Sequence, residues 1–181
     1  LILKEDIIPS SSQKVIFWAA PLLVLAPSFM LWVTIPASKS LVLRNLDLGL
    51  FYVIAFSVVT IVGLVMAGWG SANKYGSLGG LRAAAQLISY EVPVIMVVIA
   101  VAMVAQSMDI REIVIAQVPI TDTELIPKND VGIPFGVLMP LGLVVFLIAG
   151  LAEVGRTPFD IYFAESEIVG GPFVEYSGAH W

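Results

Sequence analysis

Four apolar stretches, each about 20 residues long, constrain the fold of this chain more than any other feature. They cover residues 15–35, 48–69, 83–105 and 133–152, and each is long enough to cross a bilayer as a helix. Hydrophobic residues make up 59% of the chain and charged residues only 13%, which a soluble core cannot accommodate. The sequence therefore predicts an all-α, multi-pass transmembrane helix bundle forming a single membrane domain.

Prolines and polar residues interrupt this pattern at a few places. Pro21, Pro27, Pro93 and Pro140 fall inside or near the apolar stretches, where we expect kinks. The acidic connection 106–132 should face solvent. The chain begins with Leu1 and shows no signal-peptide pattern, which suggests a fragment of a longer protein.

The basic residues give the expected orientation. Five of the nine lysines and arginines fall at the end of the bundle that holds the N-terminus, and four fall at the opposite end. This split slightly favours the N-terminal end as cytoplasmic. That end would hold the N-terminal residues 1–14, a loop at 70–82 and the C-terminal segment 153–181. Three polar elements should therefore meet at one face of the membrane.

Composition also excludes several kinds of chemistry. The chain has no cysteine, so it cannot ligate an iron–sulfur cluster or form a disulfide. It has a single histidine, His180, and no His/Cys cluster that would complete a metal site. No basic run indicates nucleic-acid binding. We therefore expect no bound metal or cofactor, and any redox centre must lie on a partner.

A dense acidic segment directly follows the fourth apolar stretch. Residues 153–178 hold five carboxylates and one arginine, with glycines and prolines that favour a shaped loop. Charge at the edge of a membrane segment is either solvated or directed at a partner. The segment is therefore a candidate for the chemistry of this chain. The alternative is that it is a solvated acidic segment that only docks on a basic partner surface.

Glu91 is the acid that lies deepest inside an apolar stretch. An ionised carboxylate at mid-helix costs about 2.5 to 3.5 kcal/mol on insertion scales, so Glu91 should face the bundle interior. Arg82, Gln86 and Tyr90 recur at i, i+4 spacing and form a polar stripe that leads toward it. This arrangement favours a proton path. The alternative is a protonated Glu91 that only stabilises helix packing through a hydrogen bond to a neighbouring helix. Glu153 could likewise be a solvated helix end.

Four ordered blocks of sequence resemble a known family. They are Lys-Glu-Asp-Ile-Ile-Pro (4–9), Ala-Gly-Trp-Gly-Ser-Ala-Asn-Lys-Tyr (67–75), Leu-Gly-Gly-Leu-Arg-Ala-Ala-Ala-Gln-Leu-Ile-Ser-Tyr-Glu (78–91) and Glu-Tyr-Ser-Gly (175–178). In this order and at these separations they resemble the H-subunit family of respiratory complex I, an NADH:quinone oxidoreductase. The resemblance spans nearly the whole chain.

The resemblance implies a membrane-arm subunit that carries no redox centre. Such a subunit builds part of a quinone-access chamber, and its buried acids couple quinone reduction to proton translocation. By motif match, the quinone-cavity loop holds Arg156, Phe159 and Asp160. The proton path holds Glu91, Glu153, Glu165, Glu167 and Glu175, with Arg82 on a second cytoplasmic loop.

The resemblance also implies the surroundings of the chain. Quinone would be the substrate, and the iron–sulfur clusters would lie on partner subunits of the membrane and peripheral arms. The isolated chain is not expected to be active. The expected location is the cell membrane of a bacterium or archaeon, in preference to an organelle inner membrane or a thylakoid.

Departures from the commonest family pattern leave the electron donor open. Val154, Gly155 and Thr157, and the run 161–163, differ from the usual complex I loop, so its backbone could differ too. The segments 154–156 and 171–175 look closer to archaeal reduced-F420 dehydrogenases and energy-converting hydrogenases. A membrane anchor of either enzyme is therefore an alternative. An ion-coupled secondary transporter that uses Glu91 is a second one, although repeated halves are not evident.

Overall fold

The computed structural model describes residues 5, 7–35, 44–117, 133–161 and 165–177. Those residues form helices and turns and no strand, which confirms the all-α prediction. The elements are α1 (Lys14–Leu31), α2 (Gly49–Gly70), α3 (Lys74–Ala105), α4 (Ile110–Ile115), α5 (Phe135–Leu138), α6 (Pro140–Glu153), α7 (Glu165–Ile168) and the 3₁₀ turn η1 (Gly171–Phe173). Among them, α1, α2 and α3 are long and apolar enough to cross a membrane, and α6 is a shorter apolar helix.

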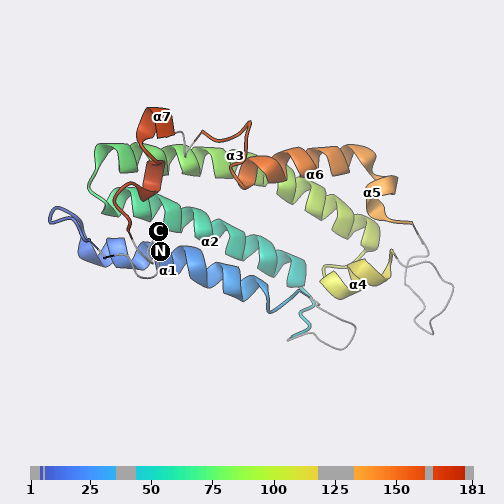
Figure 1. The fold of residues 1–181 in the computed structure, drawn as a ribbon. Coiled ribbons are helices and arrows are strands. Elements are labelled where there is room, and N and C mark those ends of the chain that lie inside the picture. Colours follow the sequence, from blue (N-terminus) through green and yellow to red (C-terminus); the bar gives the residue numbers. More distant parts are fainter. Residues whose placement is uncertain (1–4, 6, 36–43, 118–132, 162–164, 178–181) are drawn as a thin grey trace.

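Successive long helices run in opposite directions along the bundle (Figure 1). Helix α2 lies between α1 and α3, and α6 packs on α3. The C-terminal elements α7 and η1 then lie over the half of α3 nearest its N-terminus, and η1 also contacts α2. Helix α3 is thus the element that both α6 and the C-terminal segment share.

Helix α3 begins nine residues before the start predicted from hydropathy. Residues 70–82 were expected to form a loop, but the helix starts at Lys74, so Arg82 lies on a helix and not on a loop. The start is fixed by Asn73, whose side-chain oxygen accepts a hydrogen bond of 2.9 Å from the backbone N–H of Tyr75. At 32 residues, α3 is about 48 Å long and exceeds a hydrocarbon core of about 30 Å.

The fourth apolar stretch, predicted as one span over 133–152 with a kink near Pro140, is two helices. It is divided into α5 and α6 at Met139, whose φ of −124° and ψ of 66° are not helical. The division follows from Pro140, which has no N–H to continue a helix but suits the first turn of a new one. Helix α6 has 14 residues and a length of about 21 Å. Helix α1 is also shorter than predicted and ends at Leu31.

Glycines let α2, α3 and η1 approach closely. A Cβ placed at Gly68 would lie 2.5 Å from the carbonyl oxygen of Gly76, and one at Gly79 would lie 2.5 Å from the Cα of Gly171. Side chains at these positions would separate the backbones. Glycine is therefore what allows η1 to lie directly on α3.

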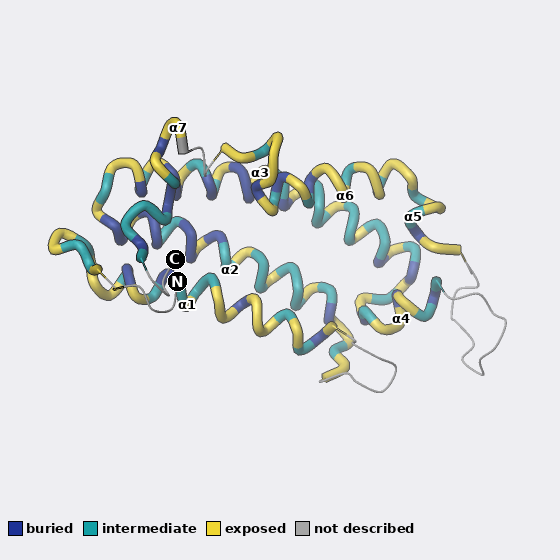
Figure 2. Tube along the Cα trace, in the orientation of Figure 1, coloured by how far each residue is buried: buried dark blue, intermediate teal, exposed yellow. Residues whose placement is uncertain are grey.

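Burial is uneven along the bundle (Figure 2). Buried residues gather where the α2–α3 turn, α1 and η1 meet, whereas the outer faces of α1 and α6 expose large apolar side chains such as Phe29 and Leu141. Exposed apolar surface of this extent suits contact with lipid or with other membrane helices.

The connection 106–132 is described only as far as residue 117. Its prediction as a solvent-facing stretch is wrong for Asp109, which is buried. The Asp109 carboxylate caps α4 by accepting a hydrogen bond of 2.8 Å from the N–H of Arg111.

Candidate functional site

The N-terminal stretch, the α2–α3 turn and the C-terminal segment meet at one end of the bundle. The N–H of Ile7 donates to Ser177 Oγ over 3.1 Å, and the N–H of Gln13 donates to the carbonyl of Gly70 over 3.3 Å. The ring of Tyr176 stacks on Phe17 with centroids 4.2 Å apart. The expected meeting of three polar elements is therefore what the fold brings about.

Tyr176 anchors the C-terminal segment on α1. Its hydroxyl donates to the carbonyl of Phe17 over 3.3 Å, and the side chain is buried. Burial raises the pKa of Tyr176 to about 12, because the charged phenolate would lose its hydration.

Two acidic residues of the C-terminal segment are held by polar residues of α3 and its N-cap. Arg82 donates to Glu167 at 2.7 Å, in an ion pair that is partly exposed. Asn73 Nδ2 donates to Glu175 at 2.6 Å. These contacts fix the segment along the N-terminal half of α3. Glu165 begins α7, but its side chain lies outside the described part of the structure.

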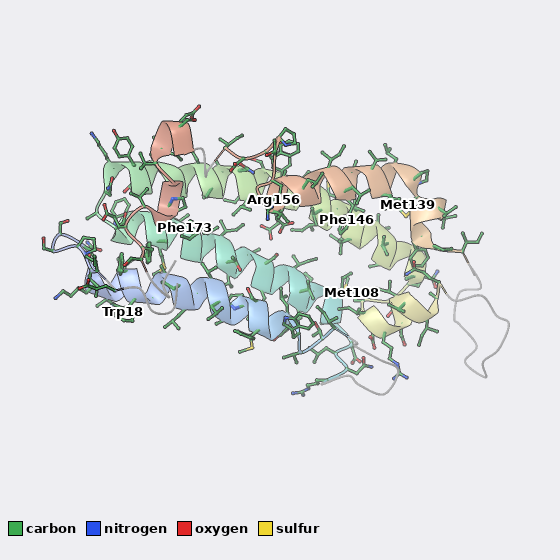
Figure 3. The ribbon with its side chains drawn as sticks, viewed as in Figure 1. Trp18, Met108, Met139, Phe146, Arg156 and Phe173 are labelled. Atoms are coloured by element: carbon green, nitrogen blue, oxygen red, sulfur yellow. The ribbon has the colours of Figure 1, made fainter. Side chains whose placement is uncertain are left out.

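A turn follows directly after α6 and carries the residues that the motif match assigned to the quinone cavity. Gly155, with a φ of 65°, ends α6, because its N–H binds the carbonyl of Ala152 and the N–H of Arg156 binds that of Leu151. Glycine adopts positive φ without strain, so this departure from the usual loop suits the backbone that the turn requires. Arg156 lies where the chain leaves α6 above α3 (Figure 3).

Within the turn 156–160, the charged side chains and the aromatic ring face different surroundings. Arg156 and Asp160 are exposed, whereas Phe159 is half-buried. The turn is closed by the Phe159 N–H, which donates to the Arg156 carbonyl over 2.8 Å. A cation, a carboxylate and a partly exposed aromatic ring thus lie within five consecutive residues.

Helix α3 holds this turn through two residues of its polar stripe. Gln86 Nε2 donates to the carbonyls of Ala152 and Phe159, both over 2.7 Å. One helical turn further on, the ring of Tyr90 meets that of Phe159 edge-on at a centroid distance of 5.3 Å. The sequence pattern identified the stripe but gave no sign of these partners.

Glu91 faces the interior of the bundle, as expected for a charged residue inside an apolar helix. It is 8% exposed, and its Oε1 lies 2.6 Å from Ser57 Oγ on α2. Ser57 Oγ also lies 2.8 Å from the carbonyl of Ile54. Ser57 was missed by sequence reasoning, because a serine 34 positions away carries no local signal of this contact.

The fold divides the predicted acidic path into two groups. Glu91 of α3 and the half-buried Glu153 at the end of α6 are near enough to interact electrostatically. Glu167 and Glu175 form the other group, on the segment that covers the N-terminal half of α3. The turn 156–160 leads from the first group toward the second.

A family model described as NADH dehydrogenase matches residues 1–181. The chain belongs to the NADH dehydrogenase family. This family member is 46% identical over 181 residues to the H subunit of the NADH-quinone oxidoreductase from Bacillus thuringiensis, covering 100% of the chain and 50% of that relative. It is 43% identical over 178 residues to the H subunit of the NADH-quinone oxidoreductase from Dehalococcoides mccartyi, covering 98% of the chain and 46% of that relative.

These comparisons confirm the resemblance inferred from the four sequence blocks. The relatives are named as subunits of an NADH-quinone oxidoreductase, an oxidoreductase complex, and the apolar helices identify this family member as a membrane protein. The chain spans about half the length of the curated relatives that it matches.

The described part of this NADH dehydrogenase family member holds no group of three or more His, Asp or Glu residues that could bind a metal. It does hold an apolar cavity of about 280 Å³, lined by residues that include Leu50, Val101, Phe135, Met139 and Phe146. This cavity lies toward the far end of α3, near α4 and α5, and therefore is not the chamber expected beside Arg156.

Proposed function

We propose that this chain forms part of the quinone-access chamber of a complex I-like oxidoreductase, together with the acidic path that couples quinone reduction to proton translocation. The observation that carries the proposal is the placement of the Arg156 turn on α3. Through Gln86 and Tyr90, the exposed turn is fixed to the helix that carries the buried Glu91. A substrate bound at the turn would lie at one end of a line of titratable groups.

The turn has the chemical groups that a quinone headgroup requires. A guanidinium such as that of Arg156 can donate to a quinone oxygen and stabilise negative charge as it develops there. The Phe159 ring offers an apolar surface beside it. This chain supplies no electrons, since it has no cysteine for a cluster, so the iron–sulfur clusters would lie on partner subunits.

The Glu91–Ser57 contact explains how a proton could be held within the membrane. A hydroxyl has one proton, so Ser57 cannot donate to Ile54 and to Glu91 at the same time. A protonated Glu91 donates to Ser57, which then donates to Ile54, whereas an ionised Glu91 accepts the Ser57 proton. Glu153 lies near enough to Glu91 for the charge of one carboxylate to affect the other, and a negatively charged quinol bound at the turn would act on both.

The outer acids would extend this path toward the partner subunits. Glu167 and Glu175, fixed by Arg82 and Asn73, lie where a peripheral arm would dock, and Glu165 lies on the same short helix as Glu167. In this role the chain resides in the bacterial cell membrane among other membrane-arm and peripheral-arm subunits. The shared end of the bundle then faces the cytoplasm.

The Glu91→Gln variant of the full-length protein, in the assembled complex in vesicles, tests the coupling role. Glutamine preserves the contact with Ser57 but cannot release a proton, so proton translocation should fall about tenfold or more while assembly is retained. Glu112→Gln, at an exposed acid on α4 beyond the C-terminal end of α3, is the matched control. Normal translocation in Glu91→Gln would leave Glu91 with a packing role only.

Photolabelling with a quinone analogue tests the substrate role. Label should appear within residues 156–160 of the assembled complex and be displaced by excess quinone. Label that is absent there, in a complex that reduces protons or oxidises reduced coenzyme F420, would favour the hydrogenase or F420 dehydrogenase anchor. Solute uptake driven by protons through the full-length protein alone would favour a transporter.

A further inference from the structure

We propose that Gln86 is a positioning residue that fixes the Arg156–Asp160 turn on α3. The inference deepens the proposed function, on which it rests for the meaning of the turn. None of the motif assignments gives Gln86 a role. The two N–H donors of the Gln86 amide, its unpaired oxygen and the other contacts of the turn with α3 all support this role.

Both amide hydrogens of Gln86 are committed to the turn and its base. Nε2 lies 2.7 Å from the Ala152 carbonyl, in the last turn of α6, and 2.7 Å from the Phe159 carbonyl, seven residues later. One side chain therefore joins both the end of α6 and the turn to α3. The amide orientation is fixed, because the opposite orientation would bring Oε1 against two carbonyl oxygens.

The oxygen of the same amide has no such partner. Within the described residues, Gln86 Oε1 is buried and accepts no hydrogen bond, although the side chain is only 6% exposed. An unpaired buried acceptor opposes folding. A glutamine that tolerates this cost is placed there for its two donors, which points to a role in positioning and not in stability.

The remaining contacts of the turn with α3 lie beside Gln86. Tyr90, one helical turn away, touches the Phe159 ring, while Arg156 and Asp160 are exposed. Since a displacement of about 1 Å can lower a rate about 100-fold, loss of the Gln86 contacts should affect a substrate bound to Arg156 even though Gln86 does not touch it.

The test compares Gln86→Met with Gln13→Met in the assembled complex that contains the full-length protein. Methionine matches glutamine in length and helix propensity and also removes the unpaired oxygen, so α3 should still fold. Gln13 is exposed and undergoes the same chemical change. Tyr90→Leu, which removes the ring contact but leaves the amide, is a second variant.

The first measurement is hydrogen–deuterium exchange of the peptide that covers residues 153–161. In Gln86→Met, exchange of the Gly155, Arg156 and Phe159 amides should be about tenfold faster or more. Their hydrogen bonds lie within the turn or join it to the end of α6, so they should open more often once Gln86 no longer holds both on α3. Gln13→Met should exchange as the parent does, and Tyr90→Leu should lie between the two. Unchanged exchange in Gln86→Met would overturn the positioning role, whatever the activity.

The second measurement separates this inference from the proposed function. If the turn binds quinone, kcat/KM for quinone should fall about 10- to 100-fold in Gln86→Met, mainly through KM. Faster exchange with normal quinone kinetics would support the positioning role while contradicting the assignment of the turn to the quinone chamber.

Discussion

At the scale of single residues, the chemistry of this chain depends on polar groups whose partners lie far away in sequence. Glu91 is conspicuous in the sequence because it is an acid within an apolar stretch, but its partner Ser57 is 34 positions away on another helix. The contact matters because a carboxyl group buried without a partner is costly.

Replacing Ser57 with alanine should destabilise the protein by about 1 to 3 kcal/mol, since Glu91 would then lose its hydrogen-bond partner. Thermal unfolding of the full-length protein in detergent measures the change. Ser28→Ala is the control, because the exposed Ser28 hydroxyl bonds the Val24 carbonyl of its own helix. Equal stability of the two variants would mean that the Glu91 contact contributes nothing.

Tyr176 provides a pH-dependent prediction outside the membrane-spanning helices. Its pKa is raised from 10.0 to about 12, so the folded state favours the neutral phenol. The corresponding stability is complete below pH 10 and is lost as the pH rises from 10 to about 12. The tyrosinate absorbance of the full-length protein should therefore include a late step that Tyr176→Phe removes. Tyr75→Phe, at an exposed ring, should leave that step in place.

At the scale of elements, the C-terminal segment is positioned by a close backbone contact. Gly79 of α3 leaves no room for a side chain against Gly171 and Pro172. Gly150 of α6 is the opposite case, because a Cβ there would meet nothing within 4 Å. The two glycines therefore provide a matched pair for the same substitution.

Gly79→Ala should destabilise the protein by about 1 to 3 kcal/mol, because η1 must move away from α3. Gly150→Ala should stabilise it by about 0.5 to 1 kcal/mol through helix propensity. Thermal unfolding of the two variants measures both effects. A neutral Gly79→Ala would show that η1 is not held against α3.

Much of the element pattern was predictable from hydropathy, and the errors have local causes. The bounds of α2 agree with the prediction to one residue at each end, because its ends coincide with the ends of the apolar stretch. Hydropathy missed the first nine residues of α3, because this segment begins with Lys74 and ends with Arg82, both charged. The segment is nevertheless helical, and Asn73 caps its start. It also joined α5 and α6 into one span, although the kink expected near Pro140 falls where the two helices divide.

At the scale of the whole molecule, the alternating helices bring the three polar segments to one end. Single cysteines can test this arrangement in membranes, since this chain has none of its own. Cysteines at Ser11, Lys74 and Ser166, all exposed, should react with an impermeant maleimide from the same side. A cysteine at Glu112 should react only from the other side. Reaction of positions 112 and 166 from one side would contradict a bundle that crosses the membrane.

The sequence by itself determined that this chain is an apolar helical membrane protein, because bilayer thickness and backbone hydrogen bonding leave few alternatives for such long apolar stretches. It also determined which acids stand out, since an intramembrane carboxylate is costly wherever its helix packs. Only the tertiary structure decided the partners of those groups. The Ser57–Glu91 contact and the Gln86 contacts with Ala152 and Phe159 join positions 34, 66 and 73 residues apart. Such pairings depend on how helices are packed and rotated against each other, which hydropathy does not specify.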